Sequence, residues 1–271
     1  MTWLQLAPST PPVVLAHRGD ADHAPENTLA AFRAAVAAGA RAVETDVQLS
    51  ADGVPLLLHD DGPARTTDSL ARGIPAETSI ESLPWETLAG LDAGSWFDER
   101  FRGEPIPLLA DLGGLLATAL ATGDATRPSV GLDLEIKPPL LHSAARVVDA
   151  VAAELARPVW ADLVATGEVV VTSFDPEVVT LALDRLPVPV GLLTATTPEP
   201  EEVPELAASG IAALVTEQED VTAAAVSAAH AVGLPVGVYT ANAPEWERVV
   251  AVGVDIVCTD DPGGLRAYLA R

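Results

Sequence analysis

An imidazole and a guanidinium follow directly after the first apolar run of the chain. His17 and Arg18 come at the end of Val13–Ala16, which reads as a strand. Such groups at the carboxyl end of a strand suit general acid–base chemistry beside a phosphate. The active sites of parallel barrels lie at that end of their strands. A loop histidine beside a surface arginine is the alternative, and this segment alone does not separate the two.

Two acidic residues with one residue between them lie inside the second apolar run, Ala42–Leu49. Residues i and i+2 of a strand share a face, so Glu44 and Asp46 point the same way. Two carboxylates about 4 Å apart repel each other by roughly 4 kcal/mol at an effective dielectric of about 20. A buried pair therefore needs a cation or another partner. The alternative is a half-exposed strand that turns its polar face to water.

The same spacing recurs in a later predicted strand, Val130–Ile136, where Asp133 and Glu135 precede Lys137. Lys137 is the only lysine of the chain, and every other basic residue is arginine. A compact ammonium has a use where a planar guanidinium does not fit, so we interpret Lys137 as a site residue. A surface ion pair between Glu135 and Lys137 is the alternative.

The three acids Glu44, Asp46 and Glu135 make an all-oxygen set, which Mg²⁺ or Ca²⁺ prefers and Zn²⁺ does not. We therefore expect one divalent cation. Arg18 and Lys137 could hold a phosphate beside it, and they would offset the acidity of the chain for an anionic substrate.

A second histidine is brought to the same place by a predicted hairpin. Only four residues join Ala42–Leu49 to the next apolar run, Val54–Leu58. A parallel crossover needs a dozen residues or more, so the two runs should pair antiparallel with Asp-Gly in the turn. This pairing places His59 within about one residue of Thr45. His17 and His59 could then transfer protons.

The elements that position these groups alternate between short apolar runs and amphipathic, alanine-rich stretches, which indicates an α/β fold with a parallel sheet. Closed into a ring, the units form a TIM-type (β/α)8 barrel with a small insertion after the early β-hairpin; left open, they form a doubly wound sheet. The hairpin accounts for the ninth strand. The remaining predicted strands are Val169–Thr172, Val190–Leu193, Ala212–Val215, Val236–Tyr239 and Ile256–Cys258. Helices are predicted over Thr28–Ala38, Leu140–Ala156, Pro176–Leu186, Pro204–Ala208, Val221–Ala231, Pro244–Val252 and Pro262–Leu269.

The insertion covers about residues 61–107 and breaks the alternation. A structureless loop of this length is unusual, so we expect short helices that cover one mouth of the barrel. Trp96 and Phe97 are expected to pack in the insertion's own core, and a patch that faces the substrate is the alternative. Elsewhere, Asn27 is expected to cap the following helix. No other candidate site residues cluster with His23, His142 or His230 in the sequence, so these histidines are expected to be solvated or packed.

Five motifs in this order and spacing resemble the glycerophosphodiester phosphodiesterase family. They are His17-Arg18-Gly19, Pro25-Glu26-Asn27-Thr28, Glu44-Thr45-Asp46-Val47, His59-Asp60 and Leu134-Glu135-Ile136-Lys137. The sequence departs from the family's pattern with Asp61 after His59-Asp60, where proline is common, and with Tyr239, where tryptophan is common.

The resemblance implies a TIM barrel that uses a divalent metal to hydrolyse glycerophosphodiesters to glycerol 3-phosphate and an alcohol. It assigns roles to nine residues: metal ligands Glu44, Asp46 and Glu135; acid–base residues His17 and His59; phosphate-binding residues Arg18 and Lys137; and substrate-lining residues Phe174 and Tyr239. Two other functions stay open. One is a lysophospholipase-D-like or phospholipase-like hydrolase on the same barrel, and the other is a non-catalytic phosphodiester-binding barrel.

Composition limits the partners. The 271 residues are 49% apolar and include 15 basic and 39 acidic residues, for a net charge of −24. This supports a single domain over 1–271 and excludes the basic footprint of a nucleic-acid-binding protein. One cysteine, Cys258, excludes an intrachain disulfide. The segment 1–12 lacks the features of a signal peptide and no run spans a membrane, so we expect a cytoplasmic enzyme with a small-molecule substrate and no stable membrane insertion. The mature form of a secreted protein is the alternative. The sequence does not indicate the oligomeric state.

Overall fold

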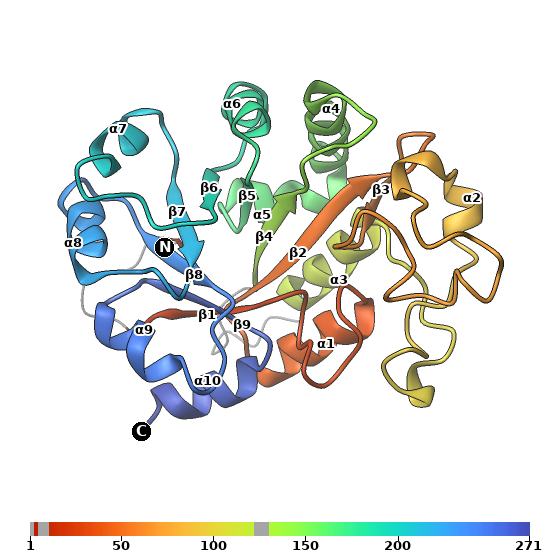
Figure 1. Cartoon of the computed structure of the whole chain (residues 1–271), viewed down its shortest axis with the longest axis horizontal. Coiled ribbons are helices and arrows are strands. Elements are labelled where there is room, and N and C mark those ends of the chain that lie inside the picture. The colour runs from red at the N-terminus through yellow and green to blue at the C-terminus, as the bar shows by residue number, and fades with distance from the viewer. Residues whose placement is uncertain (1–2, 5–10, 122–129) are drawn as a thin grey trace.

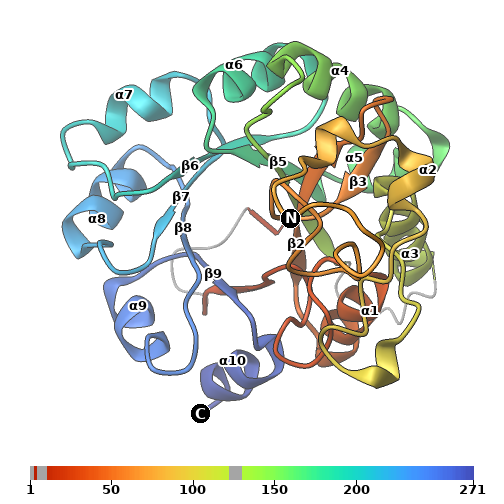
Figure 2. The ribbon, with the colours of Figure 1, turned by 45° about the vertical axis from the view of Figure 1, so that its right-hand side comes forward.

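Eight parallel strands close into a barrel. The structure is a computed structural model that describes residues 3–4, 11–121 and 130–271, so most of the segment 1–12 lies outside the described residues. The barrel strands are β1 (Val13–Ala16), β2 (Ala42–Leu49), β4 (Gly131–Ile136), β5 (Val169–Ser173), β6 (Val190–Thr194), β7 (Ala213–Glu217), β8 (Val236–Tyr239) and β9 (Ile256–Thr259). β1 pairs with both β2 and β9, which closes the ring. The TIM-barrel prediction is confirmed, and Figure 2 shows the ring with helices outside it.

Helices follow the strands and cover the outside of the ring (Figure 1). The longer ones are α1 (Leu29–Ala38), α3 (Leu109–Ala121), α4 (Ala144–Leu155), α6 (Pro176–Arg185), α7 (Val203–Ala208), α8 (Ala223–Ala231), α9 (Trp246–Val252) and α10 (Pro262–Leu269). The shorter helical segments are α2 (Trp85–Leu88), α5 (Ala161–Ala165), and the 3₁₀ turns Ile80–Ser82, Glu99–Phe101 and Pro158–Trp160.

Among the longer helices, α3 and α4 differ most from the sequence prediction. α3 was not predicted because its middle holds two glycines, which are poor helix formers. Gly113 is needed there, since a Cβ would lie 2.7 Å from ring atoms of Trp160. α4 begins later than predicted, because Ser143 caps it by accepting a hydrogen bond from the backbone of Arg146.

A tryptophan closes the amino-terminal end of the barrel. Trp3 is 2% exposed and packs with Leu15, Ala42 and Ile256 inside the ring. Its indole Nε1 donates to the carbonyl of Glu168 over 3.1 Å. The barrel interior is therefore apolar at this end, and polar side chains collect at the other.

Gly131 on β4 leaves the space that Trp3 fills. A Cβ at Gly131 would lie 2.1 Å from Cδ1 of Trp3. We expect Gly131→Ala to lower the free energy of unfolding by about 1–3 kcal/mol, as other overpacking substitutions do. Gly114→Ala is the control, because it meets open space and should stabilise α3 by up to about 1 kcal/mol. Urea unfolding of both variants measures the difference, and equal stability of the two would contradict this packing.

The predicted hairpin is confirmed. β3 (Pro55–Leu57) pairs antiparallel with β2, with Val47 opposite Leu57. The amide of Leu58 continues the ladder by donating to the carbonyl of Asp46 over 3.1 Å. The next residue, His59, is thereby placed beside the acidic pair of β2, as the sequence predicted.

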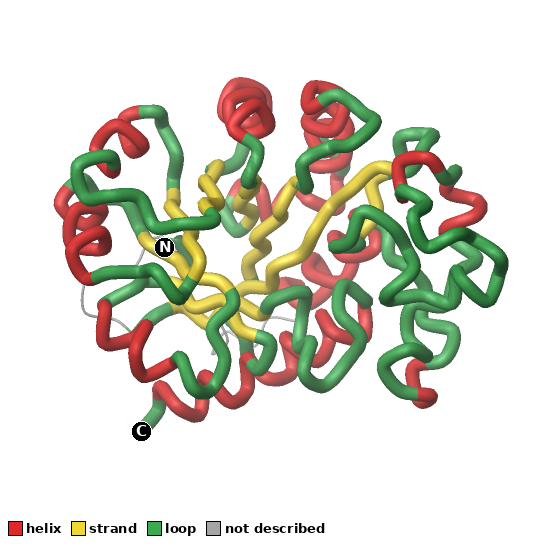
Figure 3. The backbone as a smooth tube through the Cα atoms, viewed as in Figure 1, coloured by secondary structure: helices red, strands yellow, loops and turns green. Residues whose placement is uncertain are grey.

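The insertion after the hairpin consists mostly of loops, with short helical turns (Figure 3). Its own core is aliphatic and includes Ile80, Leu88 and Ile106. The prediction that Trp96 lies in this core is wrong, because its side chain is 40% exposed. Its indole Nε1 donates to the carbonyl of Ala93, and the buried cluster of the insertion consists of aliphatic residues without Trp96. Among the described residues no helix is long and apolar enough to cross a membrane.

Candidate active site

The loop after β1 has a backbone that only a few residue types adopt. Arg18 has a φ of 53° and Gly19 a φ of 88°. A Cβ on Gly19 would lie 2.6 Å from the backbone of Ala31, so glycine is required by space as well as by φ. Arg18 is strained in this region. In return, its amide donates to Oε2 of Glu44 over 2.8 Å, which ties the loop to the acidic strand.

Three predicted metal ligands come together in the barrel. In the pairing of β2 with β4, Asp46 lies opposite Glu135, in the last pair but one of the ladder. Glu44, Asp46 and Glu135 each offer an oxygen within 4.8 Å of the others, and all three are buried. The shared face predicted for the i and i+2 positions is confirmed, and the half-exposed alternative is wrong.

The donor set fits a hard divalent cation. Oδ1 of Asp46 is buried and accepts no hydrogen bond within the described part of the chain. Burial, together with the charges of Asp46 and Glu135, raises the pKa of Glu44 well above its usual range. Such a concentration of buried negative charge is costly without a counterion, and oxygen ligands suit Mg²⁺ or Ca²⁺.

Asp46 is fixed by a residue whose role the sequence did not reveal. Nδ2 of Asn27 donates to Oδ2 of Asp46, and Oδ1 of Asn27 accepts from Thr45, both over 2.7 Å. The prediction that Asn27 caps α1 is wrong, since Thr28 provides the cap. Asn27, with a φ of 55°, instead turns back toward the acidic strand.

The two predicted phosphate-binding cations lie on either side of Asp46. Arg18 Nε is 3.3 Å from Oδ2 of Asp46, and Lys137 Nζ is 3.4 Å from Oδ1 of Asp46 and 2.8 Å from Glu135. Burial alone would raise the pKa of Asp46, but Arg18 and Lys137 outweigh it and hold this pKa below the usual value.

Both predicted acid–base histidines contact an aspartate through Nδ1. His17 Nδ1 lies 2.6 Å from Asp260, and His59 Nδ1 lies 2.8 Å from Asp60. Arg65 also bonds to Asp60 and lowers the pKa of that carboxyl to about 2. Burial lowers the pKa of His59, although the charge of Asp46 acts in the opposite direction. No role was predicted from the sequence for either aspartate.

These groups surround one cavity of about 170 Å³. Of the nine predicted site residues, all except Asp46 line it, and Asp46 lies behind its wall with 1% exposure. Phe174 and Tyr239 form one side, with ring centroids 5.5 Å apart in an edge-to-face contact. The Tyr239 hydroxyl donates to the carbonyl of Thr194 over 3.0 Å, which fixes the ring. Cys258 lines the cavity as well.

The insertion contacts one loop and one helix next to this site through two of its carboxylates. The buried carboxylate of Glu81 accepts hydrogen bonds from the backbone amides of Leu140, Leu141 and His142, just after Lys137. Glu104 accepts from the amide of Ala30 in the first turn of α1. The residues 140–142, predicted as helix, therefore give their amides to Glu81 instead.

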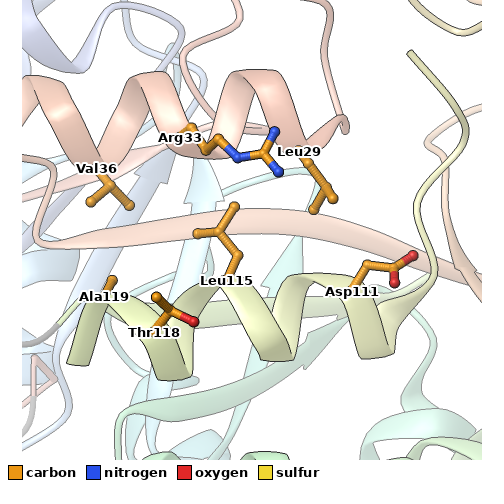
Figure 4. Close-up of a pocket in the computed structure, with 7 residues that line it drawn as sticks. All are labelled: Leu29, Arg33, Val36, Asp111, Leu115, Thr118 and Ala119. Carbon is orange, nitrogen blue, oxygen red and sulfur yellow. The ribbon is translucent and has the colours of Figure 1, made fainter. Parts of the chain in front are cut away.

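A second hollow of about 390 Å³ lies outside the barrel between α1 and α3 (Figure 4). Its walls are largely apolar, with Leu29, Val36 and Leu115, and its charged residues are Arg33 and Asp111. Among the described residues that line it there is no acid–base pair and no group of carboxylates. Eight of the nine residues predicted from the sequence line the barrel cavity instead.

The prediction that the remaining histidines lack clustered partners is wrong for two of them. His23 Nδ1 is 2.7 Å from Asp20, and a carboxylate oxygen of Asp261 lies within 4.8 Å of both residues. His230 is 2.8 Å from Asp255. Both imidazoles are more than 40% exposed, at 63% and 43%, so these pairs lie at the surface and not in the cavity.

The comparison with known proteins agrees with this geometry. Residues 17–264, which hold all five motifs, match the model of the glycerophosphoryl diester phosphodiesterase family. The chain belongs to this family. A phosphodiesterase from Oleispira antarctica, solved in complex with the product sn-glycerol-3-phosphate, is 29% identical, with a TM-score of 0.82 over 96% of this chain and 98% of that one.

Curated glycerophosphodiester phosphodiesterases match over shorter segments. The glycerophosphodiester phosphodiesterase of Caldanaerobacter subterraneus is 42% identical over 100 residues, which are 37% of this chain and 38% of that protein. The bovine glycerophosphodiester phosphodiesterase 1 is 53% identical over 58 residues, or 21% of this chain and 18% of that protein. These alignments thus span well under two thirds of the curated relatives.

The buried carboxylates should make the stability of the cation-free protein depend on pH. Burial raises the pKa of Asp133 to about 7, and burial with the charge of Asp46 raises that of Glu135 to about 7. In the unfolded chain both pKa values are about 4, so the folded state binds more protons between about pH 4 and pH 7. The free energy of unfolding should therefore fall as the pH rises through this window, by about 1.4 kcal/mol per unit of raised pKa.

Urea unfolding in chelator at acidic and at slightly alkaline pH measures this loss. Added Mg²⁺ or Ca²⁺ should recover stability mainly at the higher pH, where the carboxylates are ionised. A profile that is flat in chelator would contradict the raised pKa values.

Proposed function

We propose that this protein hydrolyses glycerophosphodiesters to glycerol 3-phosphate and an alcohol, with one divalent cation, Mg²⁺ or Ca²⁺, held by Glu44, Asp46 and Glu135. The observation that carries the proposal is that two buried carboxylates, two imidazoles and two cationic side chains line one cavity in a member of this family, with a third buried carboxylate, that of Asp46, within 4.8 Å of the other two. The product bound by the Oleispira antarctica relative supports the choice of substrate.

In the proposed reaction, Arg18 and Lys137 bind the phosphate and offset the negative charge that grows in the transition state. The cation, when bound, polarises the phosphodiester as a Lewis acid. One histidine removes a proton from the nucleophile, either water or the glycerol 2-hydroxyl, and the other protonates the departing alkoxide. Attack by water gives glycerol 3-phosphate directly, whereas attack by the 2-hydroxyl gives a cyclic glycerophosphate that a water molecule then opens to glycerol 3-phosphate. We assign His17 as the base and His59 as the acid.

The direct test measures glycerol 3-phosphate released from a panel of glycerophosphodiesters, with and without divalent ions. We expect release that depends on the cation, and the panel would reveal the preferred alcohol. Binding of the diesters without turnover, with cation supplied, would contradict the enzyme proposal and support a binding protein.

The exposed apolar side chains near the insertion favour one second candidate. Trp96, Leu140 and Leu141 are 40%, 56% and 64% exposed, and such groups could contact an acyl chain. A lysophospholipase-D-like activity would act on the same phosphodiester group. Comparing turnover of glycerophosphocholine with that of lysophosphatidylcholine distinguishes the two substrate classes.

Lys137 should not be replaceable by arginine. Its ammonium lies between Glu135 and Asp46 and is only 16% exposed, which leaves little room for a planar guanidinium. We expect Lys137→Arg to lower kcat/KM at least about tenfold, as loss of a charge-assisted contact does. Arg33→Lys, in the hollow outside the barrel, is the control and should leave kcat/KM unchanged. Wild-type kcat/KM in Lys137→Arg would argue against a close phosphate contact.

A further inference from the structure

A chain of hydrogen bonds continues from His17 away from the cavity. Oδ1 of Asp260 lies 2.6 Å from Nδ1 of His17, and Oδ2 of Asp260 accepts from Nδ2 of Asn242 over 2.8 Å. The hydroxyl of Thr240 is 3.5 Å from the same Nδ1, which is too long to compete. His17 is thus held by one short contact, and the carboxylate that makes it is held in turn.

The orientation of the Asn242 amide follows from its partners. Oδ1 of Asn242 accepts from the backbone amide of Asp260 and from the hydroxyl of Thr259, each over 3.0 Å. A backbone N–H can only donate, so the atom facing it must be the amide oxygen. The NH₂ group of Asn242 therefore faces Asp260.

We infer that Asp260 is a positioning residue that keeps the proton of neutral His17 on Nδ1, with the lone pair of Nε2 free, and that Asn242 determines which oxygen of Asp260 does so. An ionised carboxylate can only accept, so the contacting imidazole nitrogen must carry the proton. A histidine held in this way can take a proton through its other nitrogen. The inference concerns the tautomer of His17, and its effect on turnover rests on the proposed function.

Asp260→Asn is the informative substitution, because Asn242 dictates how the new amide must lie. The NH₂ group of Asn242 needs an acceptor, so the new amide turns its oxygen toward Asn242 and its own NH₂ toward His17. That NH₂ donates to Nδ1 and moves the imidazole proton to Nε2. We expect kcat to fall by about 10²–10⁴-fold with KM little changed, as loss of the correct tautomer does in other histidine–aspartate pairs.

Exchanging the two residues should reverse this effect. In Asp260→Asn/Asn242→Asp, the carboxylate at position 242 accepts from the backbone amide, from Thr259 and from the new amide's NH₂. The oxygen of that amide then faces His17 and accepts from Nδ1–H again. We expect kcat to recover at least about tenfold relative to Asp260→Asn, because the tautomer is restored even though the charge has moved one residue away.

A second histidine–aspartate pair in the chain provides the control. Oδ2 of Asp255 lies 2.8 Å from Nε2 of His230, outside the cavity. Asp255→Asn makes the same chemical change just before β9 and should leave kcat unchanged. Circular dichroism and thermal unfolding confirm that each variant is folded before its kinetics are compared.

Nitrogen-15 NMR of the His17 ring reads the tautomer without any reaction. At a pH where the ring is neutral, the wild-type protein should carry its proton on Nδ1 and Asp260→Asn on Nε2. The same tautomer in both proteins, or an exchanged double variant that recovers nothing, would overturn the inference. A shifted tautomer with unchanged kcat would support the positioning role and contradict the base role that the proposed function gives to His17.

Discussion

Glycerophosphodiester hydrolysis should fall by at least about 10³-fold when divalent cations are removed, because the cation would supply both substrate polarisation and charge balance. The apoprotein should retain its fold and regain activity when Mg²⁺ or Ca²⁺ returns. Titration of the two ions into chelated protein, with glycerol 3-phosphate as the readout, gives the preferred ion. Full activity in excess chelator would exclude a metal-dependent mechanism.

Asp46→Asn separates the ligand role from a general effect of chelation. Asp46 is buried, and its Oδ1 accepts no hydrogen bond among the residues described. The amide keeps the bulk of the side chain but removes the charge, so cation affinity should drop and a higher ion concentration should be needed. Asp149→Asn, an exposed change on α4, should leave the ion dependence as it is in the wild type.

His17→Ala should reduce kcat by about 10²–10⁴-fold, the usual contribution of one proton transfer. The dependence of kcat/KM on pH should be bell-shaped in the wild-type protein, since one imidazole must be neutral and the other protonated. In His17→Ala the limb that reports the base should disappear. His230→Ala removes an exposed imidazole and should change neither kcat nor the pH dependence of kcat/KM.

Two results for His17→Ala would contradict the role of His17 as the base. If His17→Ala kept full activity, the base would have to be another group in the cavity. If both limbs of the pH profile survived, the base limb would belong to a group other than His17.

The barrel and the acidic centre were predictable because they depend on strand periodicity. Alternation along β2 and β4 fixes which side chains face inward, and the parallel register then brings Asp46 opposite Glu135. The four-residue link after Leu49 could only form a hairpin, so the place of His59 followed from loop length.

The supporting groups depend on contacts that no local pattern encodes. Asp260 is 243 residues from His17, and they meet only because β9 closes the ring against β1. Asn27 looked like a helix cap because capping and carboxylate binding use the same side chain. The exposure of Trp96 depended on which residues filled the core of the insertion. The composition of the insertion does not determine which of its apolar side chains are buried.

The scarcity of lysine has a practical consequence. Lys137 carries the only side-chain amine among 271 residues, and it lies in the cavity with 16% of its surface exposed. Reagents that acylate amines would therefore find no competing lysine on the outer surface. The extent of acylation at this one position, followed by mass spectrometry of the digest, would report directly on whether a ligand occupies the cavity.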